Sequence, residues 1–434
     1  MWSLTKMESG ARLMCIAVFA SMVTMVSWAE HVRGPINTSI PRQSSENADY
    51  PKLNQAWSHP TLTKIKVGED TKNVIIIGGG DASQATKTVR SADSVGNAIY
   101  IIDADNGAVL FVISAAESDV VTTEMIYAIT GRIAAVDRDE DGYVDHLYAA
   151  DTGGQLFRYD IYNGQTGIHL INGQRIADFG GDTEASHRPF YAGPDIVAVS
   201  QHHPPFFAIA LGSGQQLDAL NTSLQNSFYV YRDESVFMQD EYGRFVFPEA
   251  VVRPNHLYDA TEHLLSSDND WVKAAALAAL QDKQGWRIDL SDGGERVLNS
   301  PLIVNYQVFF TTYIPAASQP NLATSATDNA RAYLVNVFTG SAVTDLDDNN
   351  KMESIDRYAP LNQAGIPLEP SIVFKDMAEP SVCMGTECVT AAIVHDRDGN
   401  AVPCASEFAC LARHIYGRFK RVQPQAWTTT IERQ

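Results

Sequence analysis

The sequence predicts an all-β fold, a modified β-propeller of four-stranded blades. We expect about five blade-like units, in a ring that need not be complete, with one short inserted helix. Strand-type runs rich in Val, Ile, Phe, Tyr and Thr follow one another from Leu62 onward, and turns of Gly, Asp and Asn separate them. Groups of about four such runs recur at roughly 40–50 residues, and this spacing favours a propeller over a sandwich or barrel.

The predicted strands pair as hairpins along the chain. Residues 98–102 and 109–113 flank Asp103-Ala-Asp-Asn-Gly107, which we interpret as a hairpin turn because Asp, Asn and Gly favour tight turns. The other strand-type runs are 74–77, 133–136, 147–150, 155–160, 206–210, 228–231, 302–304, 308–312 and 332–337.

One segment has the character of a helix. Residues 271–280 are rich in alanine, which has the highest helix propensity. Asp268 or Ser267 is expected to cap its start, and Gly285 to end it. We interpret this helix as an insertion between two blades.

An acidic loop interrupts the strands at residues 137–145. Carboxylates stand at loop positions 1, 3, 5 and 9, and a glycine stands at position 6. Calcium takes six to eight oxygen ligands at roughly 2.3–2.6 Å, and such spacing lets alternate acids point inward. The glycine permits the sharp turn, and position 7 offers a backbone carbonyl. The sequence therefore predicts a Ca²⁺ site with the ligands Asp137, Asp139, Asp141, Tyr143 and Asp145; a solvated acidic turn is the alternative.

A second acidic stretch runs from Asp345 to Glu353. It also has ligand-type residues at positions 1, 3, 5 and 9, but it lacks the glycine at position 6 and carries Lys351 at position 7. Whether this stretch binds a second calcium ion or is a solvated loop stays open at this point.

Composition and the N-terminus indicate an exported protein. The net charge of −20 over 434 residues argues against binding to nucleic acid, whose phosphates it would repel. Residues 1–29 resemble a signal peptide, with Lys6 and Arg12 before an apolar run and small residues before a cut at Glu30. We expect a polar linker over 30–55, one domain over 56–434, no transmembrane segment in the mature chain, and a location in the periplasm or at the outer cell surface.

Four of the five cysteines lie close together near the C-terminus, at positions 383, 388, 404 and 410. In an exported chain an even number of cysteines indicates disulfides, with three possible connectivities. The local pairs Cys383–Cys388 and Cys404–Cys410 are favoured by proximity, and a zinc site is the alternative.

Taken together, these motifs resemble the C-terminal β-propeller of the PilC/PilY family, proteins associated with the tip of type IV pili. The resemblance is strongest at Val136–Tyr148, which is followed by Asp151-Thr-Gly-Gly-Gln-Leu-Phe-Arg-Tyr-Asp160. Weaker segments agree in order over roughly 50–430: Trp57–Pro60, Gly212–Gly214 before Phe228–Tyr231, Gly285–Leu290 and Gly365–Pro370. Family members are usually longer, with an adhesive N-terminal region that does not precede Trp57 here.

The resemblance implies a non-enzymatic, calcium-binding factor in pilus biogenesis or adhesion, located on the pilus. It implies pilin or minor pilins as partners, with a host or surface ligand as a further partner. Two alternatives stay open: a quinoprotein dehydrogenase of the PQQ type, whose propellers also bind calcium, and a non-catalytic propeller scaffold or lectin. The sequence contains two faint quinoprotein-like repeats and no adjacent cysteine pair, and no catalytic set of residues stands out.

Overall fold

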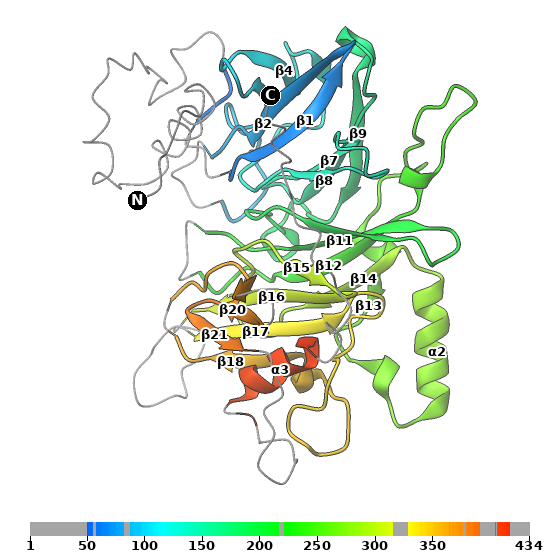
Figure 1. The fold of residues 1–434 in the computed structure, drawn as a ribbon. Coiled ribbons are helices and arrows are strands. Elements are labelled where there is room, and N and C mark those ends of the chain that lie inside the picture. The colour runs from blue at the N-terminus through cyan, green and yellow to red at the C-terminus, as the bar shows by residue number, and fades with distance from the viewer. Residues whose placement is uncertain are drawn as a thin grey trace, which may run out of the picture.

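The computed structural model contains five antiparallel-rich sheets arranged one after another (Figure 1). The structure describes residues 50–54, 58–81, 87–216, 221–315, 329–363, 365–375, 379–390, 404 and 406–416. The predicted signal peptide, most of the predicted linker, and Trp57 lie outside these residues. The prediction of an all-β fold with about five blade-like units is confirmed.

Each sheet is built from consecutive stretches of the chain. The first has the order β1-β2-β3-β4-β5, the second β6-β7-β8-β9, the third β10-β11-β12-β14-β13, the fourth β15-β16-β17-β18 and the fifth β19-β20-β21. The strands of the first two sheets are β1 (Thr61–Val67), β2 (Asp70–Gly78), β3 (Ala98–Asp103), β4 (Val109–Ser114), β5 (Val120–Val121), β6 (Ala134–Val136), β7 (His146–Ala150), β8 (Gln155–Ile161) and β9 (Ile171–Asp178).

The remaining strands complete three further sheets. They are β10 (Asp195–Val199), β11 (Phe206–Gly212), β12 (Ser227–Asp233), β13 (Tyr258–Asp259), β14 (Gly285–Asp289), β15 (Leu302–Val304), β16 (Gln307–Ile314), β17 (Asn329–Asn336), β18 (Tyr358–Leu361), β19 (Ser371–Lys375), β20 (Glu379–Met384) and β21 (Glu387–Thr390). Short 3₁₀ turns include η3 (Gly167–His169), η5 (Ser235–Phe237) and η9 (Ser354–Arg357).

Successive sheets share hydrophobic seams, as blades of a propeller do. Phe157 of the second sheet and Ile99 of the first belong to one hydrophobic cluster. Tyr148 of the second sheet packs with Phe207 of the third, and Phe228 of the third packs with Phe310 of the fourth. A fourth seam joins the fourth and fifth sheets. Each large side chain removed from water contributes about 1.5–3 kcal/mol, so the seams hold successive sheets together.

The two ends of the array are covered differently. Tyr50 and Leu53 pack on the first sheet, where the backbone N–H of Lys52 donates to the Tyr100 hydroxyl at 2.8 Å. At the other end, α3 (Glu407–Tyr416) packs against β18 of the fourth sheet and β21 of the fifth, and its Phe408 and Leu411 enter the fourth seam. Among the described residues, no hydrophobic cluster joins the fifth sheet to the first.

The predicted helix is present as α2 (Asp270–Gln281), but its placement was predicted wrongly. It connects β13 to β14 within the third sheet, so it is an insertion inside one blade. The cap is Asn269, whose side-chain oxygen accepts from the N–H groups of Trp271 and Val272. Gly285 does not end the helix, because it begins β14 with a φ of +133°.

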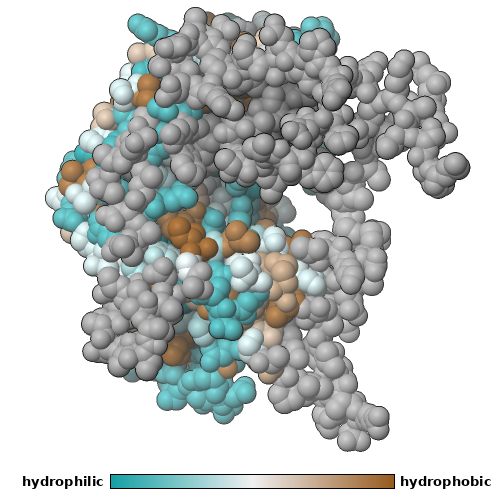
Figure 2. All heavy atoms as spheres, turned by 90° about the vertical axis from the view of Figure 1, so that its left-hand side faces the viewer, coloured by the Kyte–Doolittle hydropathy of each residue, from teal (hydrophilic) through white to brown (hydrophobic). Residues whose placement is uncertain are grey.

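Both local pairs predicted for the late cysteines are confirmed. Cys383 and Cys388 are bonded across β20 and β21, and Cys404 is bonded to Cys410 of α3. Among the described residues, no helix combines the length and apolar character needed to cross a membrane. On the coloured part of the face in Figure 2, hydrophobic residues form a few small groups among hydrophilic ones.

Candidate metal centre

The acidic loop connects β6 to β7 in the second sheet, as the flanking strand-type runs predict. Its base is closed by the N–H of Asp145, which donates to the carbonyl of Val136 at 2.9 Å. At the turn, Glu140 and Gly142 have φ values of +63° and +93°. A Cβ added at Gly142 would meet nothing within 4 Å, so the requirement for glycine is conformational and not steric.

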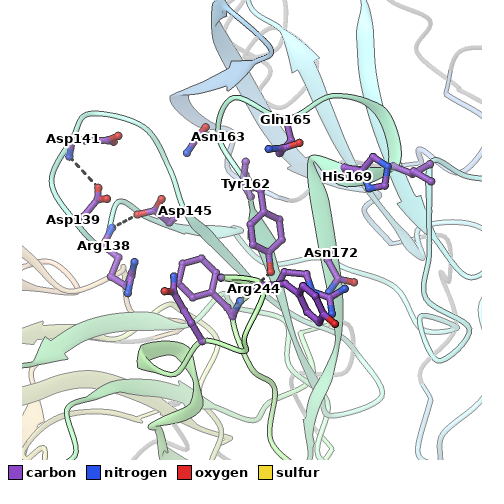
Figure 3. Close-up of a pocket in the computed structure, with 16 residues that line it drawn as sticks. Arg138, Asp139, Asp141, Asp145, Tyr162, Asn163, Gln165, His169, Asn172 and Arg244 are labelled. Atoms are coloured by element: carbon purple, nitrogen blue, oxygen red, sulfur yellow. Dashed lines mark hydrogen bonds between the residues drawn. The ribbon is translucent and has the colours of Figure 1, made fainter.

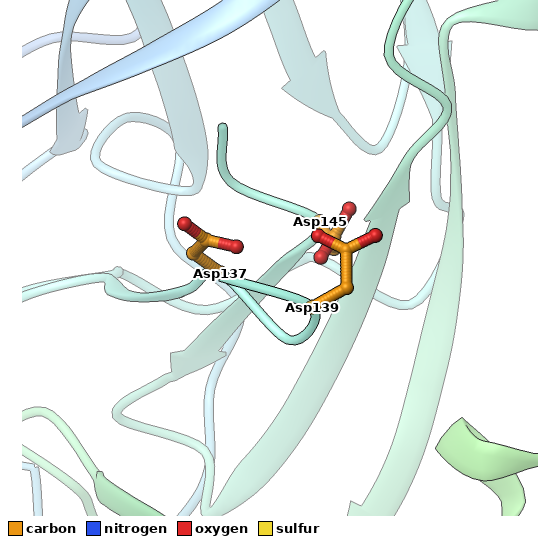
Figure 4. Close-up of side chains that lie close together, drawn as sticks. All are labelled: Asp137, Asp139 and Asp145. Atoms are coloured by element: carbon orange, nitrogen blue, oxygen red, sulfur yellow. The ribbon is translucent and has the colours of Figure 1, made fainter. Parts of the chain in front are cut away.

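Three of the predicted ligands come together in this loop. Asp137, Asp139 and Asp145 each offer a carboxylate oxygen, and these oxygens lie within 4.8 Å of one another. Figure 4 shows the three carboxylates around a shared space. This donor set consists of oxygens only and is rich in charge, which suits a hard cation such as calcium.

The other two predicted ligands occupy different places. The Asp141 carboxylate lies outside this cluster and accepts the N–H of Tyr143 at 2.9 Å. The hydroxyl of Tyr143 lies 2.8 Å from Oγ1 of Thr71 on β2, which ties the loop to the first sheet. The Tyr143 carbonyl at position 7 stays a predicted ligand.

Backbone N–H groups already surround the carboxylates. Asp137 accepts from the N–H of Gly142 at 2.8 Å, and Asp145 accepts from that of Arg138 at 2.8 Å. These contacts favour the ionised acids, but Asp145 is 9 % exposed, and its burial is the main cause of a raised pKa. The charge of nearby Asp139 adds to this increase in pKa. A bound cation would relieve both the desolvation and the repulsion.

The loop is anchored to three sheets. The N–H of Val144 donates to the carbonyl of Lys64 on β1 at 2.9 Å. Arg138 reaches in the other direction, with its guanidinium 4.6 Å from the ring centre of Phe245, which follows β12. The shape of this loop is therefore linked to the first and third sheets as well as to its own.

A second acidic cluster lies between β17 and β18. Asp345 and Asp347 of the second predicted stretch gather with Asp356 of η9, again with oxygens within 4.8 Å of one another. The predicted positions 5 and 9 are not part of this cluster: the Asn349 side chain lies 2.9 Å from both Asp347 and Glu353. Asp356 is 0 % exposed, and it lies too far along the chain for a nine-residue pattern to include it.

Comparisons with known proteins agree with the propeller. Residues 41–208, which contain the loop 137–145, match the model of the PilY1 beta-propeller domain. Over these residues the chain is therefore similar to a PilY1-type propeller. A type IV pilus biogenesis factor PilY1 homolog of Xylella fastidiosa (strain Temecula1 / ATCC 700964) is 28 % identical over 204 residues. That alignment covers 45 % of this chain and 13 % of the relative, so this chain spans a small part of the relative's length.

Solved structures extend the likeness of the fold beyond residue 208. The C-terminal domain of Pseudomonas aeruginosa PilY1 superposes with a TM-score of 0.54 at 16 % identity, covering 79 % of this chain and 73 % of that domain. BamB from Moraxella catarrhalis, at a TM-score of 0.23 and 8 % identity, is far more distant. The resemblance predicted over roughly 50–430 is therefore supported by sequence in the first half and by fold over most of the chain.

Proposed function

We propose that this chain is a non-enzymatic, calcium-binding factor of type IV pilus biogenesis, exported to the cell surface. The match of residues 41–208 to the PilY1 propeller domain supports the pilus role, and the name of the Xylella relative agrees with it. The gathering of three carboxylates within 4.8 Å in the loop 137–145 carries the calcium part of the proposal.

The proposed role of calcium follows from electrostatics. Without a cation, the carboxylates of Asp137, Asp139 and Asp145 repel one another and favour a more open loop. A bound ion neutralises them and favours one closed shape. Pilin or minor pilins are the proposed partners, because the similar proteins belong to type IV pilus biogenesis. We expect such a partner to bind the loop surface in only one of these two shapes.

Calcium can act as a switch only if it binds one conformation more tightly than another, because equal affinity shifts no population. The anchors at Lys64, Thr71 and Phe245 limit the change to the loop and its immediate neighbours. We therefore expect a loop that is mobile without calcium and ordered with it, on a propeller that changes little. Amide hydrogen exchange with calcium or with a chelator measures this difference directly.

The deciding experiment combines calorimetry with a cell assay. Wild-type protein should bind one calcium ion at the loop, and Asp145→Ala should remove a ligand and weaken that binding. Cells producing Asp145→Ala should export the protein but show altered pilus number or twitching at an equal protein level. Asp268→Ala is the matched control, since Asp268 is an exposed aspartate away from the loop.

Two outcomes would change the proposal. Absence of calcium binding by the wild type at millimolar calcium would remove the calcium part. The wild type could bind calcium while its piliation equals that of Asp145→Ala at every calcium concentration. The ion would then have a structural role only, and the proposal of a calcium switch would be wrong.

A further inference from the structure

A groove of about 750 Å³ lies next to the acidic loop. Carboxylates of the loop 137–145 line one end of it, and Gln165, His169 and Asn172 line the other (Figure 3). The hairpin 239–245, which follows β12 of the third sheet, forms a further wall. The groove therefore crosses from the second sheet to the third, and its volume lies in the range of about 300–1,000 Å³ that is typical of small-molecule sites.

The lining of this groove is mostly polar. Of its sixteen residues, only four lack a polar side-chain atom: Ile161, Ile168, Gly243 and Phe245. Small-molecule pockets are usually lined by apolar side chains, with a few polar groups that orient the ligand. Polar groups that lose water without gaining a new partner cost free energy. A ligand of this groove must therefore carry hydrogen-bonding groups along most of its length.

Three side-chain amides in the groove are free to bind such a ligand. Gln165, Asn172 and Gln239 are exposed, and their amides form no hydrogen bond within the described part of the chain. The amide of Asn163, by contrast, is already hydrogen-bonded to backbone atoms. Each free amide offers both donors and an acceptor, so it pairs well with a group that also donates and accepts, as a hydroxyl does.

The net charge of the groove excludes an acidic ligand. When Asp137 of the metal cluster and Asp240 of the hairpin are counted with the lining residues, five carboxylates stand against the guanidiniums of Arg138 and Arg244. The formal charge is minus three with histidine uncharged, and it stays at minus one with a divalent cation in the loop. Because like charges oppose binding, an acidic ligand is repelled with or without the ion.

The charges are also arranged against a basic chain. The free carboxylates gather at one end of the groove, in the loop 137–145, and Asp240 is already paired with Arg244 at 2.9 Å. A basic chain would find carboxylate partners there only, and it would compete for them with a metal ion and meet the charge of Arg138. An uncharged ligand with many hydroxyl groups avoids both conflicts, because hydroxyls donate to carboxylates and accept from guanidiniums and amides.

An exposed tyrosine at the rim adds an apolar ring to these polar groups. Tyr242 is 74 % exposed, and the guanidinium of Arg244 lies 5.4 Å from its ring centre. The turn that carries it is held in place, because Asp240 accepts the N–H groups of Tyr242 and Arg244, each at 2.9 Å, and Gln239 forms a β-bridge with Phe245. The electron-rich face of a tyrosine ring suits the C–H groups of a sugar ring, and a preformed surface loses less entropy on binding.

We propose that this groove binds a short neutral oligosaccharide. Its hydroxyl groups donate to carboxylates of the loop 137–145 and exchange hydrogen bonds with the free amides of Gln165, Asn172 and Gln239, while one sugar ring packs on Tyr242. This ligand-binding activity goes beyond the proposed function. It does not rest on calcium, because the three amides and the tyrosine lie outside the loop.

The test begins with the exported chain on an array of neutral oligosaccharides of hexoses and N-acetylhexosamines. Sialylated glycans and a decapeptide of alternating Lys and Gly are included on the same array. We expect binding to at least one neutral oligosaccharide, both in millimolar calcium and with a chelator. Calorimetry with that oligosaccharide then measures the effect of removing groove side chains. Tyr242→Ala should weaken binding about tenfold, and Asn172→Ala about fivefold.

A matched control removes an exposed aromatic ring elsewhere. Trp271 of α2 is 84 % exposed and lies outside the groove lining, so Trp271→Ala should leave the affinity unchanged. Thermal unfolding of Tyr242→Ala checks that the variant is folded. The proposal is overturned if no neutral oligosaccharide binds, or if only sialylated glycans or the Lys-Gly peptide bind. It is also overturned if binding requires calcium, or if Tyr242→Ala and Trp271→Ala weaken it equally. None of these results decides the calcium proposal, which calorimetry with the ion alone tests separately.

Discussion

The loops 137–145 and 345–353 share one pattern of backbone hydrogen bonds and φ angles, but they differ in the residues at key positions. In both, the N–H at position 6 donates to the aspartate at position 1, at 2.8 Å from Gly142 to Asp137 and at 2.7 Å from Asn350 to Asp345. In both, positions 4 and 6 have positive φ. The difference is at position 6, which is glycine in the first loop and asparagine in the second.

The closing acid differs as well. Asp145 belongs to the first loop itself, whereas the buried Asp356 reaches the second cluster from η9. Asp356 also accepts the N–H groups of Leu346 and Glu353, at 2.8 and 2.7 Å. In both loops the closing carboxylate lies in the acidic cluster and also accepts backbone N–H groups. The spacing of the acids therefore does not tell whether the closing acid acts as a metal ligand or as a backbone cap.

Removing the closing acid of the first loop should have the largest effect. Asp145→Asn keeps the size of the side chain but removes one charged ligand, and we expect calcium affinity at this loop to fall about 100-fold. Calorimetry measures the loss, and any heat from the second loop should remain. Unchanged calcium affinity in Asp145→Asn would remove Asp145 from the ligand set.

The equivalent change in the second loop should act mainly on stability. Asp356→Asn replaces a carboxylate that caps two backbone N–H groups by an amide with one acceptor, which leaves a buried group unpaired and costs about 2 kcal/mol. Urea unfolding measures this cost. The exposed Asp347 provides the control, because Asp347→Asn should change stability little. If Asp356→Asn and Asp347→Asn lowered calcium affinity equally and left stability unchanged, the second loop would instead be a metal-binding loop of the kind proposed for the first.

The residue at position 6 offers an exchange between the loops. Gly142→Ala should destabilise the first loop by about 1–2 kcal/mol, because a side chain at positive φ is strained. Asn350→Gly should have the opposite sign and a smaller size in the second loop. Calcium titrations and thermal unfolding of the two variants measure both effects; the same sign in both loops would contradict the shared pattern.

Acid should weaken calcium binding at the first loop. Burial raises the pKa of Asp145, so protons compete with calcium at a higher pH than for an ordinary carboxylate. We expect the affinity to fall about tenfold between pH 7 and pH 5, with proton release on binding. For the metal-free protein, folding stability depends on pH with the opposite sign. The folded state binds a proton at Asp145 that the unfolded state has lost, so stability increases as the pH falls through the raised pKa of Asp145. Calorimetry in buffers of different ionisation enthalpy detects the released proton, and Asp145→Asn should abolish most of it.

The smallest expected effect concerns position 7. Lys351 is an exposed cation beside the second cluster, where it opposes a bound cation. Lys351→Gln should raise any calcium affinity there about twofold, the range of an exposed charge contact. An equal effect on the first loop would show that the change acts through net charge alone.

The sequence predicted what is local and missed what depends on tertiary contacts. The acidic loop and its flanking strands are contiguous, so spacing and strand propensity placed Asp137, Asp139 and Asp145 together. Asp356 was missed because η9 brings it in from outside the pattern. The groove beside the acidic loop, lined by Arg138 and by the hairpin 239–245, was missed because this hairpin comes from the third sheet. Nothing in the hairpin's sequence indicates that Phe245 packs against Arg138.

The same limit explains the helix. Its alanine-rich run predicted α2 almost to the residue, but the propensity of a segment does not report which sheet its neighbours join. β13 and β14 pair with each other across the helix, so the sheet order alone shows that α2 lies within a blade.

The hydrophobic seams between the sheets have a consequence for mechanical behaviour. Within the described residues each seam joins only sequence neighbours, so the five sheets resemble a linear repeat array whose stability is a sum of nearest-neighbour couplings. Such an array frays from its ends. The two disulfides lie in and beside the last sheet, where fraying from that end would begin, and the acidic loop clasps the first three sheets from the other side. A pulling force applied along this array would therefore be resisted by the two disulfides at one end. With calcium bound, it would be resisted near the other end by the acidic loop and its ion.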